Sequence, residues 1–303
     1  MKSKSLVRLG ALAVLWGSGF LFIKEALTGL SPFQIVFGRM LAAAVAMLAL
    51  TLATKRRLPT DPRIWVHLAV MATITNIAPY FLFAWAELRV TSGLAGVLNA
   101  TTPLFTLMAA MATGTERSAP TRLAGLLIGL LGVVILAAPW ATPQRSTLAG
   151  IVAALVASAC YALGYIYARR FLTSRAVPAV VLSTGQMVAG TVLLAFAAPV
   201  LGRGHVHLTT TVIAAVLALG VVGTGASYVL NYQLIADEGP TAASTATYLI
   251  PVVAVILGAL VLAEPVTWNL ALGAFTILAG VALSEGRIPH LLRTPRRKQP
   301  ANP

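Results

Sequence analysis

Charged residues are scarce in this chain of 303 residues. Asp, Glu, Lys and Arg together make up 10% of it, whereas 58% of its residues are hydrophobic and its mean hydropathy is +0.87. A soluble domain carries about 25% charged residues, which cover its surface in water. Because this chain has too few polar residues for such a surface, the sequence excludes an ordinary soluble fold and predicts a protein embedded in lipid.

Residues that hold metals or carry out catalysis are also few. The one cysteine, Cys160, excludes an intrachain disulfide and a multi-cysteine metal site. The sequence contains no paired-Asp motif for phosphotransfer, no His-Glu-x-x-His and no phosphate-binding glycine loop. We therefore expect no metal, no cofactor and no catalytic residue, and an integral-membrane enzyme is retained as an alternative.

Basic residues outnumber acidic ones, 22 to 8, but their positions do not favour nucleic acid as a partner. They lie between apolar runs and in a C-terminal tail, without the clustered aromatics that stack on bases. If the N-terminus is cytoplasmic, 17 basic residues fall in inner segments, 4 in outer segments, and Arg39 falls within a span. This bias predicts that both termini are cytoplasmic.

Apolar runs of about 20 residues, the length that crosses a bilayer, occur ten times. The first follows Lys2, Lys4 and Arg8 and is expected to be a retained helix. The predicted spans lie near residues 7–25, 34–54, 64–86, 92–113, 121–139, 146–168, 178–201, 209–234, 239–262 and 266–285.

The two halves of the chain contain an internal repeat with a shift of 148 residues. The matched pairs are Pro103 and Pro251, Glu116 and Glu264, Gly125 and Gly273, Gly132 and Gly280, and Tyr80 and Tyr228. Five spans per repeat is an odd number, so the second repeat starts on the opposite side of the membrane. We predict an all-α integral membrane protein of ten transmembrane helices in two inverted-topology repeats, residues 1–140 and 146–286, with a basic cytoplasmic tail at 287–303.

Several motifs carry a family resemblance across nearly the whole chain. They are Trp16-Gly17-Ser18-Gly19-Phe20, Ser31-Pro32, Arg39, the two Pro-Glu-Gly-Gly spacings, and Tyr161–Arg170. With them the chain resembles ten-helix members of the drug/metabolite transporter superfamily, which have two EamA-type domains. The resemblance implies a transporter that moves amino acids, other metabolites or drugs, often outward, across the inner membrane of bacteria.

Two prolines and two glycine pairs predict how the helices pack and bend. Pro103 and Pro251 each lie about 12 residues into a span, or about 18 Å deep, near the bilayer midplane. Each frees the carbonyl four residues earlier, so we predict hinges beside the transport site; packing kinks without ligand contact are the alternative. The glycines seven residues apart in the fifth and tenth spans predict close helix packing.

Polar and aromatic residues at helical spacing are the candidates for a shared substrate cavity. The polar candidates are Asn76, Tyr80, Asn99, Ser227, Tyr228, Asn231, Thr247 and Tyr248, and the aromatic ones are Trp16, Phe20, Tyr161 and Tyr165. Thr224 belongs to the same polar stripe as Ser227 and Asn231. Interhelical hydrogen bonding or packing explains any one of them equally well.

The charges inside the spans restrict the substrate. No Asp, Glu or His lies deep in a span, which argues against multiply cationic drugs and against a proton relay at the bilayer centre. Arg39 is the candidate contact for a carboxylate near the outer mouth, and a side chain that extends toward the outer lipid headgroups is the alternative. We predict a secondary transporter that exports neutral or zwitterionic metabolites such as amino acids by alternating access, with a drug or multidrug efflux carrier as the alternative. Its expected partners are the small-molecule substrate and membrane lipid, and its oligomeric state is left open between a monomer and higher forms.

Overall fold

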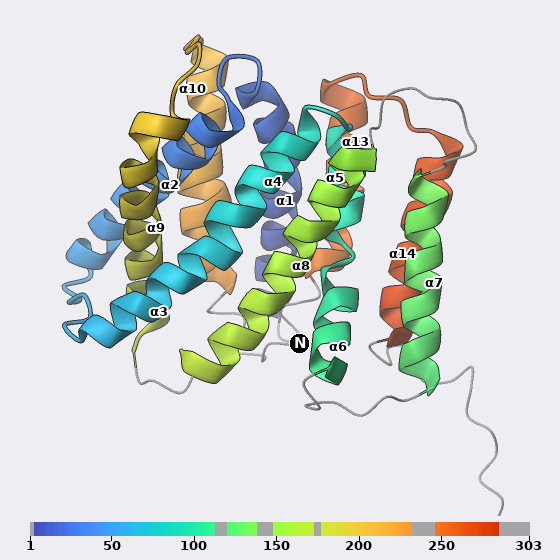
Figure 1. Cartoon of the computed structure of the whole chain (residues 1–303), viewed down its shortest axis with the longest axis horizontal. Helices are drawn as coiled ribbons and strands as arrows, with labels where there is room; N and C mark the ends of the chain where they lie inside the picture. The colour runs from blue at the N-terminus through green and yellow to red at the C-terminus, as the bar shows by residue number, and fades with distance from the viewer. Residues whose placement is uncertain (1–2, 113–119, 138–147, 173–176, 232–245, 285–303) are drawn as a thin grey trace, which may run out of the picture.

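The computed structural model describes residues 3–112, 120–137, 148–172, 177–231 and 246–284, and every regular element in those ranges is a helix (Figure 1). The elements are α1 (Ser3–Ala26), α2 (Pro32–Ala53), α3 (Pro62–Ala72), η1 (Thr73–Ile77), α4 (Ala78–Glu87), α5 (Ser92–Asn99), α6 (Thr102–Ala112), α7 (Pro120–Ala137), α8 (Leu148–Phe171), α9 (Ala179–Leu201), α10 (Thr210–Leu217), η2 (Ala218–Ala226), α13 (Ala246–Val261) and α14 (Trp268–Ser284). Residues 227–231 continue the helix after η2. The predicted all-α class is confirmed for these residues.

Within the described ranges, six helical stretches are long and apolar enough to cross a membrane. They are Val7–Ala26, Pro32–Ala53, Pro62–Glu87, Leu148–Ala168, Ala179–Leu201 and Thr210–Asn231. Three shorter apolar helices, Leu123–Ile135, Leu249–Val261 and Trp268–Leu283, accompany them. Large apolar side chains face outward on this bundle, for example Phe196, which is 81% exposed, and Trp268, which is 84% exposed. A lipid surrounding explains such an apolar exterior, which water would not favour.

The breaks between helices contain the sequence signals that end and start them. Ser31 caps α2 because its hydroxyl accepts from the backbone N–H of Gln34, and the Gln34 side chain accepts from the Ser31 N–H in return. Pro32 occupies the first turn, where its missing N–H costs nothing. Asp61 caps α3 by accepting from the backbone N–H of Arg63, and Pro62 occupies its first turn.

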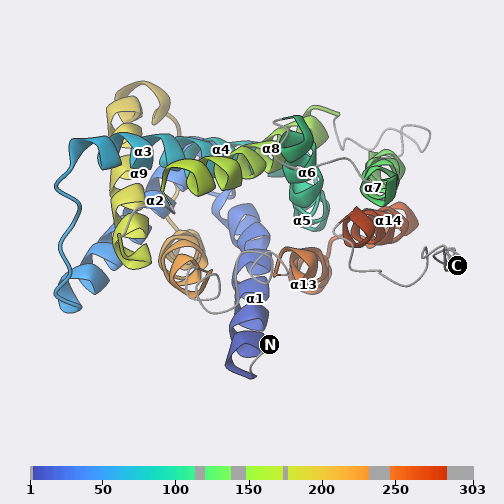
Figure 2. The ribbon, with the colours of Figure 1, turned by 90° about the horizontal axis from the view of Figure 1, so that it is seen from below.

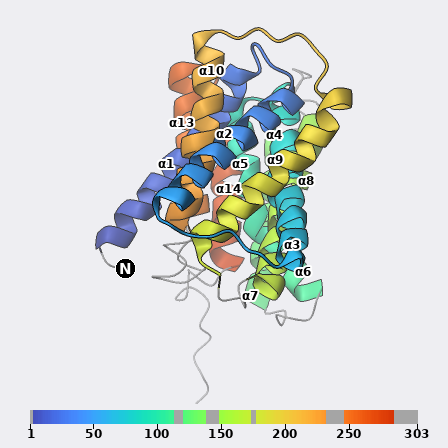
Figure 3. The same ribbon diagram turned by 90° about the vertical axis from the view of Figure 1, so that its left-hand side faces the viewer.

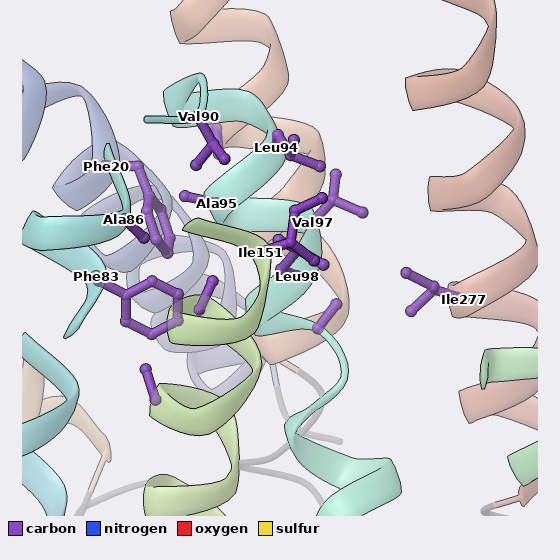
Figure 4. Packing of buried hydrophobic residues seen from close by; sticks show 14 of the residues in the cluster. Phe20, Phe83, Ala86, Val90, Leu94, Ala95, Val97, Leu98, Ile151 and Ile277 are labelled. Carbon is purple, nitrogen blue, oxygen red and sulfur yellow. The ribbon is translucent and has the colours of Figure 1, made fainter. Parts of the chain in front are cut away.

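The helices pack into a bundle in which neighbours are often distant in sequence. Helix α1 lies between the α10–η2 segment and α13, while α8 packs along α4, α5 and α6 (Figure 2). Helices α2 and α9 run side by side (Figure 3). One apolar core joins α1, α4, α5 and α8 around Phe20, Phe83 and Leu98 (Figure 4).

Helices α7 and α14 pack against each other as the glycine spacing predicted (Figure 2). A methyl group on Gly132 would lie 2.7 Å from the Ile277 backbone nitrogen, and one on Gly280 would lie 2.6 Å from the carbonyl oxygen of Gly125. Both distances are too short for real atoms, so these backbones approach closely only because the positions have no side chain. The prediction of close packing is confirmed.

Candidate functional site

Three of the predicted cavity residues form one buried hydrogen-bonded group. The Asn76 side chain, in η1, has no solvent exposure. Its Nδ2 donates to the hydroxyl of Tyr80 in α4 at 3.0 Å and to the hydroxyl of Tyr228 at 3.1 Å. Because the two tyrosines are repeat partners, one amide joins equivalent positions of the two halves.

Gln186 of α9 completes this group, and the sequence analysis did not identify it. Its Nε2 donates to Asn76 Oδ1 at 2.6 Å and to Thr75 Oγ1 at 2.8 Å. The side chain is 1% exposed. The sequence did offer a sign of it, since Gln186 is the only amide side chain in the apolar sequence of α9. The neighbour that this side chain faces, however, depends on how α9 is rotated against η1.

Arg39 of α2 places a cation beside this group. Its Nε donates to Thr224 Oγ1 at 2.8 Å, and its Cζ lies 3.6 Å from the ring centroid of Tyr80. A cation over an aromatic face is held by the ring quadrupole. Among the described residues no carboxylate forms an ion pair with Arg39. We call Arg39, Asn76, Tyr80, Gln186, Thr224 and Tyr228 the polar cluster.

Two members of the polar cluster, Asn76 and Thr224, lie on π-helical segments at equivalent repeat positions. The shift of 148 residues places η1 on residues 221–225, which lie inside η2, and it places Asn76 on Thr224. The hydroxyls of Thr224 in η2 and of Ser227 just after it donate to carbonyls five residues earlier, at 2.9 and 2.8 Å. Short π-helical segments occur often at functional sites, which agrees with the position of the cluster.

An aromatic row lies beside the polar cluster. Phe20 of α1 meets Phe83 of α4 edge to face at 5.4 Å, and Phe83 stacks with Tyr161 of α8 at 6.2 Å (Figure 4 shows Phe20 and Phe83). Tyr161 packs against both the main apolar core and the apolar cluster that contains Tyr80. Trp16 packs against the same core. Trp16, Phe20 and Tyr161, three of the predicted aromatic residues, therefore share one region with Phe83. Phe83 itself was not among the residues predicted from the sequence.

The remaining candidates lie on several helices. Ser227 and Thr247 are buried, and Asn231 is half-buried at the end of a described range. Asn99 is buried at the end of α5, and its Oδ1 has no hydrogen-bond partner. The side chains of Tyr165 and Tyr248 lie outside the described residues.

The two predicted hinge prolines differ in their surroundings. Pro103 follows a break, because α5 ends at Asn99 and α6 begins at Thr102. The Thr102 hydroxyl donates to the Asn99 carbonyl at 2.8 Å, which satisfies the group that the proline leaves free. Pro251 lies inside the continuous helix α13.

A second polar group lies where α1, α4, α5 and the end of α13 meet. The Glu264 carboxylate accepts from Ser92 N at 2.7 Å, Ser92 Oγ at 2.9 Å and Gly93 N at 3.0 Å, at the start of α5. Lys24 Nζ donates to the carbonyls of Glu87 and Val90 at 2.5 and 3.1 Å, beyond the end of α4. Each charge therefore lies at the helix end whose dipole favours it. In the sequence, Glu264 is recognisable only as a marker of the repeat.

A bundle with an apolar exterior and a buried polar cluster is typical of a membrane transport protein. Residues 6–138 and 148–285 each match the EamA-like transporter family. The chain belongs to this family, which confirms the resemblance noted from its motifs.

Relatives of similar length carry transporter names. An uncharacterized transporter of Archaeoglobus fulgidus is 24% identical over 95% of this chain and 99% of its own. A probable amino-acid metabolite efflux pump of Escherichia coli (strain K12) is 25% identical over 94% and 95%. An uncharacterized inner membrane transporter of the same strain, YedA, is 28% identical over 82% and 80%.

The fold also matches a solved crystal structure at 22% identity, with a TM-score of 0.67 over 94% of this chain and 98% of that one. At that identity the likeness establishes the fold alone. Together, family, relatives and apolar helices identify a multi-pass membrane transporter and point away from an enzyme.

Proposed function

We propose that the protein is a secondary transporter that exports small neutral or zwitterionic metabolites, such as amino acids, across the inner membrane by alternating access. In this proposal ten helices form two inverted repeats, residues 1–140 and 146–286, with the tail 287–303 and both termini cytoplasmic. The predicted cavity residues and the hinge prolines belong to the proposal as well.

The packing of the described helices supports the inverted repeat. Helix α1 packs on α13 as α8 packs on α6, and α2 packs on η2 as α9 packs on α3 and η1. If the two halves of the chain are exchanged, each of these helix contacts therefore falls on an equivalent contact of the other half. Two halves of opposite orientation can exchange their conformations and open a central site to either side in turn.

One observation supports the proposed class of substrate: Arg39 is 7% exposed and has no carboxylate partner among the described residues. A guanidinium that is held by Thr224 and by the Tyr80 ring is positioned to bind an anionic group. The tyrosine hydroxyls beside it offer oxygen atoms to an ammonium group. A zwitterion such as an amino acid would place its carboxylate at Arg39 and its ammonium group at the tyrosine hydroxyls.

The efflux of cationic drugs fits this cluster less well, because Arg39 would repel a cation. The similarity to a probable amino-acid metabolite efflux pump supports the choice of amino acids. A neutral drug would leave the arginine without an anion, so the two substrate classes predict different behaviour toward carboxylates.

Counterflow in proteoliposomes tests the proposal. Radiolabelled amino acids should exchange with saturable kinetics, and their methyl esters, which lack the carboxylate, should not compete. Arg39→Gln should raise the KM about tenfold to 100-fold, because a charge-assisted hydrogen bond contributes about 1.5–3 kcal/mol. Arg203→Gln is the matched control, since Arg203 is exposed just beyond α9 and donates to the Pro199 carbonyl near the end of that helix.

Three outcomes would overturn the proposal. Equal competition by esters and free amino acids would show that no carboxylate is recognised. Unsaturable flux of amino acids would indicate a channel, and saturable exchange of organic cations alone would favour the drug carrier.

A further inference from the structure

Glu87, the last residue of α4, has a carboxyl group with no hydrogen-bond donor. The side chain has 0% exposure, and neither Oε1 nor Oε2 has a hydrogen-bond partner. An ionised carboxylate in such surroundings is costly because water and donors are both missing. The group must therefore either hold a proton or gain a donor.

The charges around Glu87 do not balance if every group is ionised. Lys24 of α1 and Glu264 act on it electrostatically. Glu264 accepts three hydrogen bonds at the start of α5, so it is stabilised as an anion. Lys24 supplies one positive charge for two carboxyl groups, and its ammonium group donates to backbone carbonyls, one of them the carbonyl of Glu87 itself.

Other titratable groups near this end of α4 are turned elsewhere. Arg89 lies over the Trp85 ring at 3.5 Å and donates to the Trp85 carbonyl. Helix α5 and residues 148–159 of α8 contain no titratable side chain. Glu25 is half-buried on α1 and does not form an ion pair with Lys24. With one proton on Glu87, the positive charge of Lys24 and the negative charge of Glu264 would therefore cancel.

A hollow lies beside this position. It has a volume of about 240 Å³ and is lined by Lys24, Leu27, Thr28, Glu87 and Leu88. Several water molecules fit into such a volume, since each occupies about 30 Å³. Thr28 is exposed at its edge, so the hollow brings water beside Glu87, whose carboxyl oxygens are themselves covered in this structure.

We propose that Glu87 is a proton-binding site whose occupancy is coupled to the position of Lys24, and through Lys24 to the packing of α1 against α4 and α5. With the proton bound, Glu87 is neutral and Lys24 holds the carbonyls at the end of α4. When the proton returns to water, the Lys24 ammonium leaves those carbonyls and pairs with the carboxylate. The step moves one proton between water and a carboxylate oxygen.

The coupling of this proton to transport rests on the proposed function, whereas proton binding itself does not. A movement of α1 away from α4 and α5 would separate Lys24 from the two carbonyls. Because that movement would also take the positive charge of Lys24 away from Glu87, it would favour the protonated carboxyl, and a proton gradient could drive the exchange of conformations. The ligand of this site is a proton.

Infrared difference spectroscopy of the purified protein in lipid tests proton binding directly. The wild type should show the carbonyl stretch of a protonated carboxyl without a hydrogen bond, and this band should disappear as the pH rises. Glu87→Gln should lack the band, and Glu25→Gln, the matched control on the adjacent helix, should keep it. A wild type without the band, or a band that persists in Glu87→Gln, would overturn the proposal.

Transport measurements test the coupling. In wild-type proteoliposomes an imposed pH gradient should drive accumulation of an amino acid that shows counterflow. Glu87→Gln should lose this accumulation while still exchanging the amino acid, and Glu25→Gln should accumulate normally. Gradient-driven accumulation by Glu87→Gln at the wild-type level would overturn the coupling. If the wild type exchanged no amino acid, the proposed function would fail, and the infrared result would still decide whether Glu87 binds a proton.

Discussion

Replacing Glu264 by glutamine should loosen the contact between the start of α5 and the end of α13. In the structure its two carboxylate oxygens accept from Ser92 N, Ser92 Oγ and Gly93 N. Glutamine keeps one acceptor oxygen for Ser92 N but turns an NH2 group toward the other two donors. The Ser92 hydroxyl can rotate to accept from this group, whereas the Gly93 N–H loses its acceptor.

The loss can be estimated from these contacts. One hydrogen bond to a charged acceptor contributes about 1.5–3 kcal/mol, and a carboxylate at a helix N-terminus adds about 0.3–1 kcal/mol. Together they give about 2–4 kcal/mol, and since 1.4 kcal/mol corresponds to a factor of ten, the separated form becomes about 30-fold to 1,000-fold more populated. Ser92→Ala removes one hydrogen bond to this charged acceptor but keeps the carboxylate at the helix start, so it should cost about 1.5–3 kcal/mol, or about tenfold to 100-fold.

A single cysteine can report this separation. Val255 of α13 packs against Gly93 of α5, so Val255→Cys in a Cys160→Ser background places one thiol at the contact. Its rate of reaction with a small membrane-impermeant maleimide should rise in the order wild type, Ser92→Ala, Glu264→Gln. Equal rates for the wild type and Glu264→Gln would refute the reasoning, because the carboxylate would then contribute nothing to closure.

Two further substitutions test the packing of the helices. Gly280→Ala should lower the thermal stability in detergent by about 1–3 kcal/mol, because its methyl group would meet the backbone of Gly129 and separate α7 from α14; Gly10→Ala, where a methyl group meets nothing within 4 Å, should cost nothing and can add about 0.5–1 kcal/mol. Pro103→Ala should slow transport without lowering stability, because a restored N–H can bond the Asn99 carbonyl and make α5 and α6 one helix; unchanged turnover would contradict the hinge.

Features of the fold that depend on neighbouring residues in the sequence could be predicted, whereas those that depend on contacts between distant segments could not. Helix positions, the Ser31-Pro32 start and the family followed from composition, periodicity and motif spacing. The break before Pro103 was also foreseeable, but its form was not, because the span predicted as residues 92–113 divides into α5 and α6. The hydroxyl of Thr102 makes that division stable.

The candidate site was foreseen in part for the same reason. Asn76, Tyr80 and Tyr228 were chosen from helical spacing, and the structure joins them by hydrogen bonds. Gln186 and Glu87 were not chosen, since nothing in the local pattern tells which face of a helix meets which neighbour. For Glu87 the sequence showed only an acid at a helix end, and its burial without a donor depends on how α4 packs against its neighbours.

The sequence by itself determined a lipid-embedded helical protein, an internal repeat and a transporter family. These follow from hydropathy and spacing, which are properties of the chain alone. Only the tertiary structure decided that Arg39 of one half holds Thr224 of the other, and that Glu264 holds the start of α5. Such contacts span more than 170 residues, so they are fixed by the rotation and crossing of packed helices, which the local pattern does not encode.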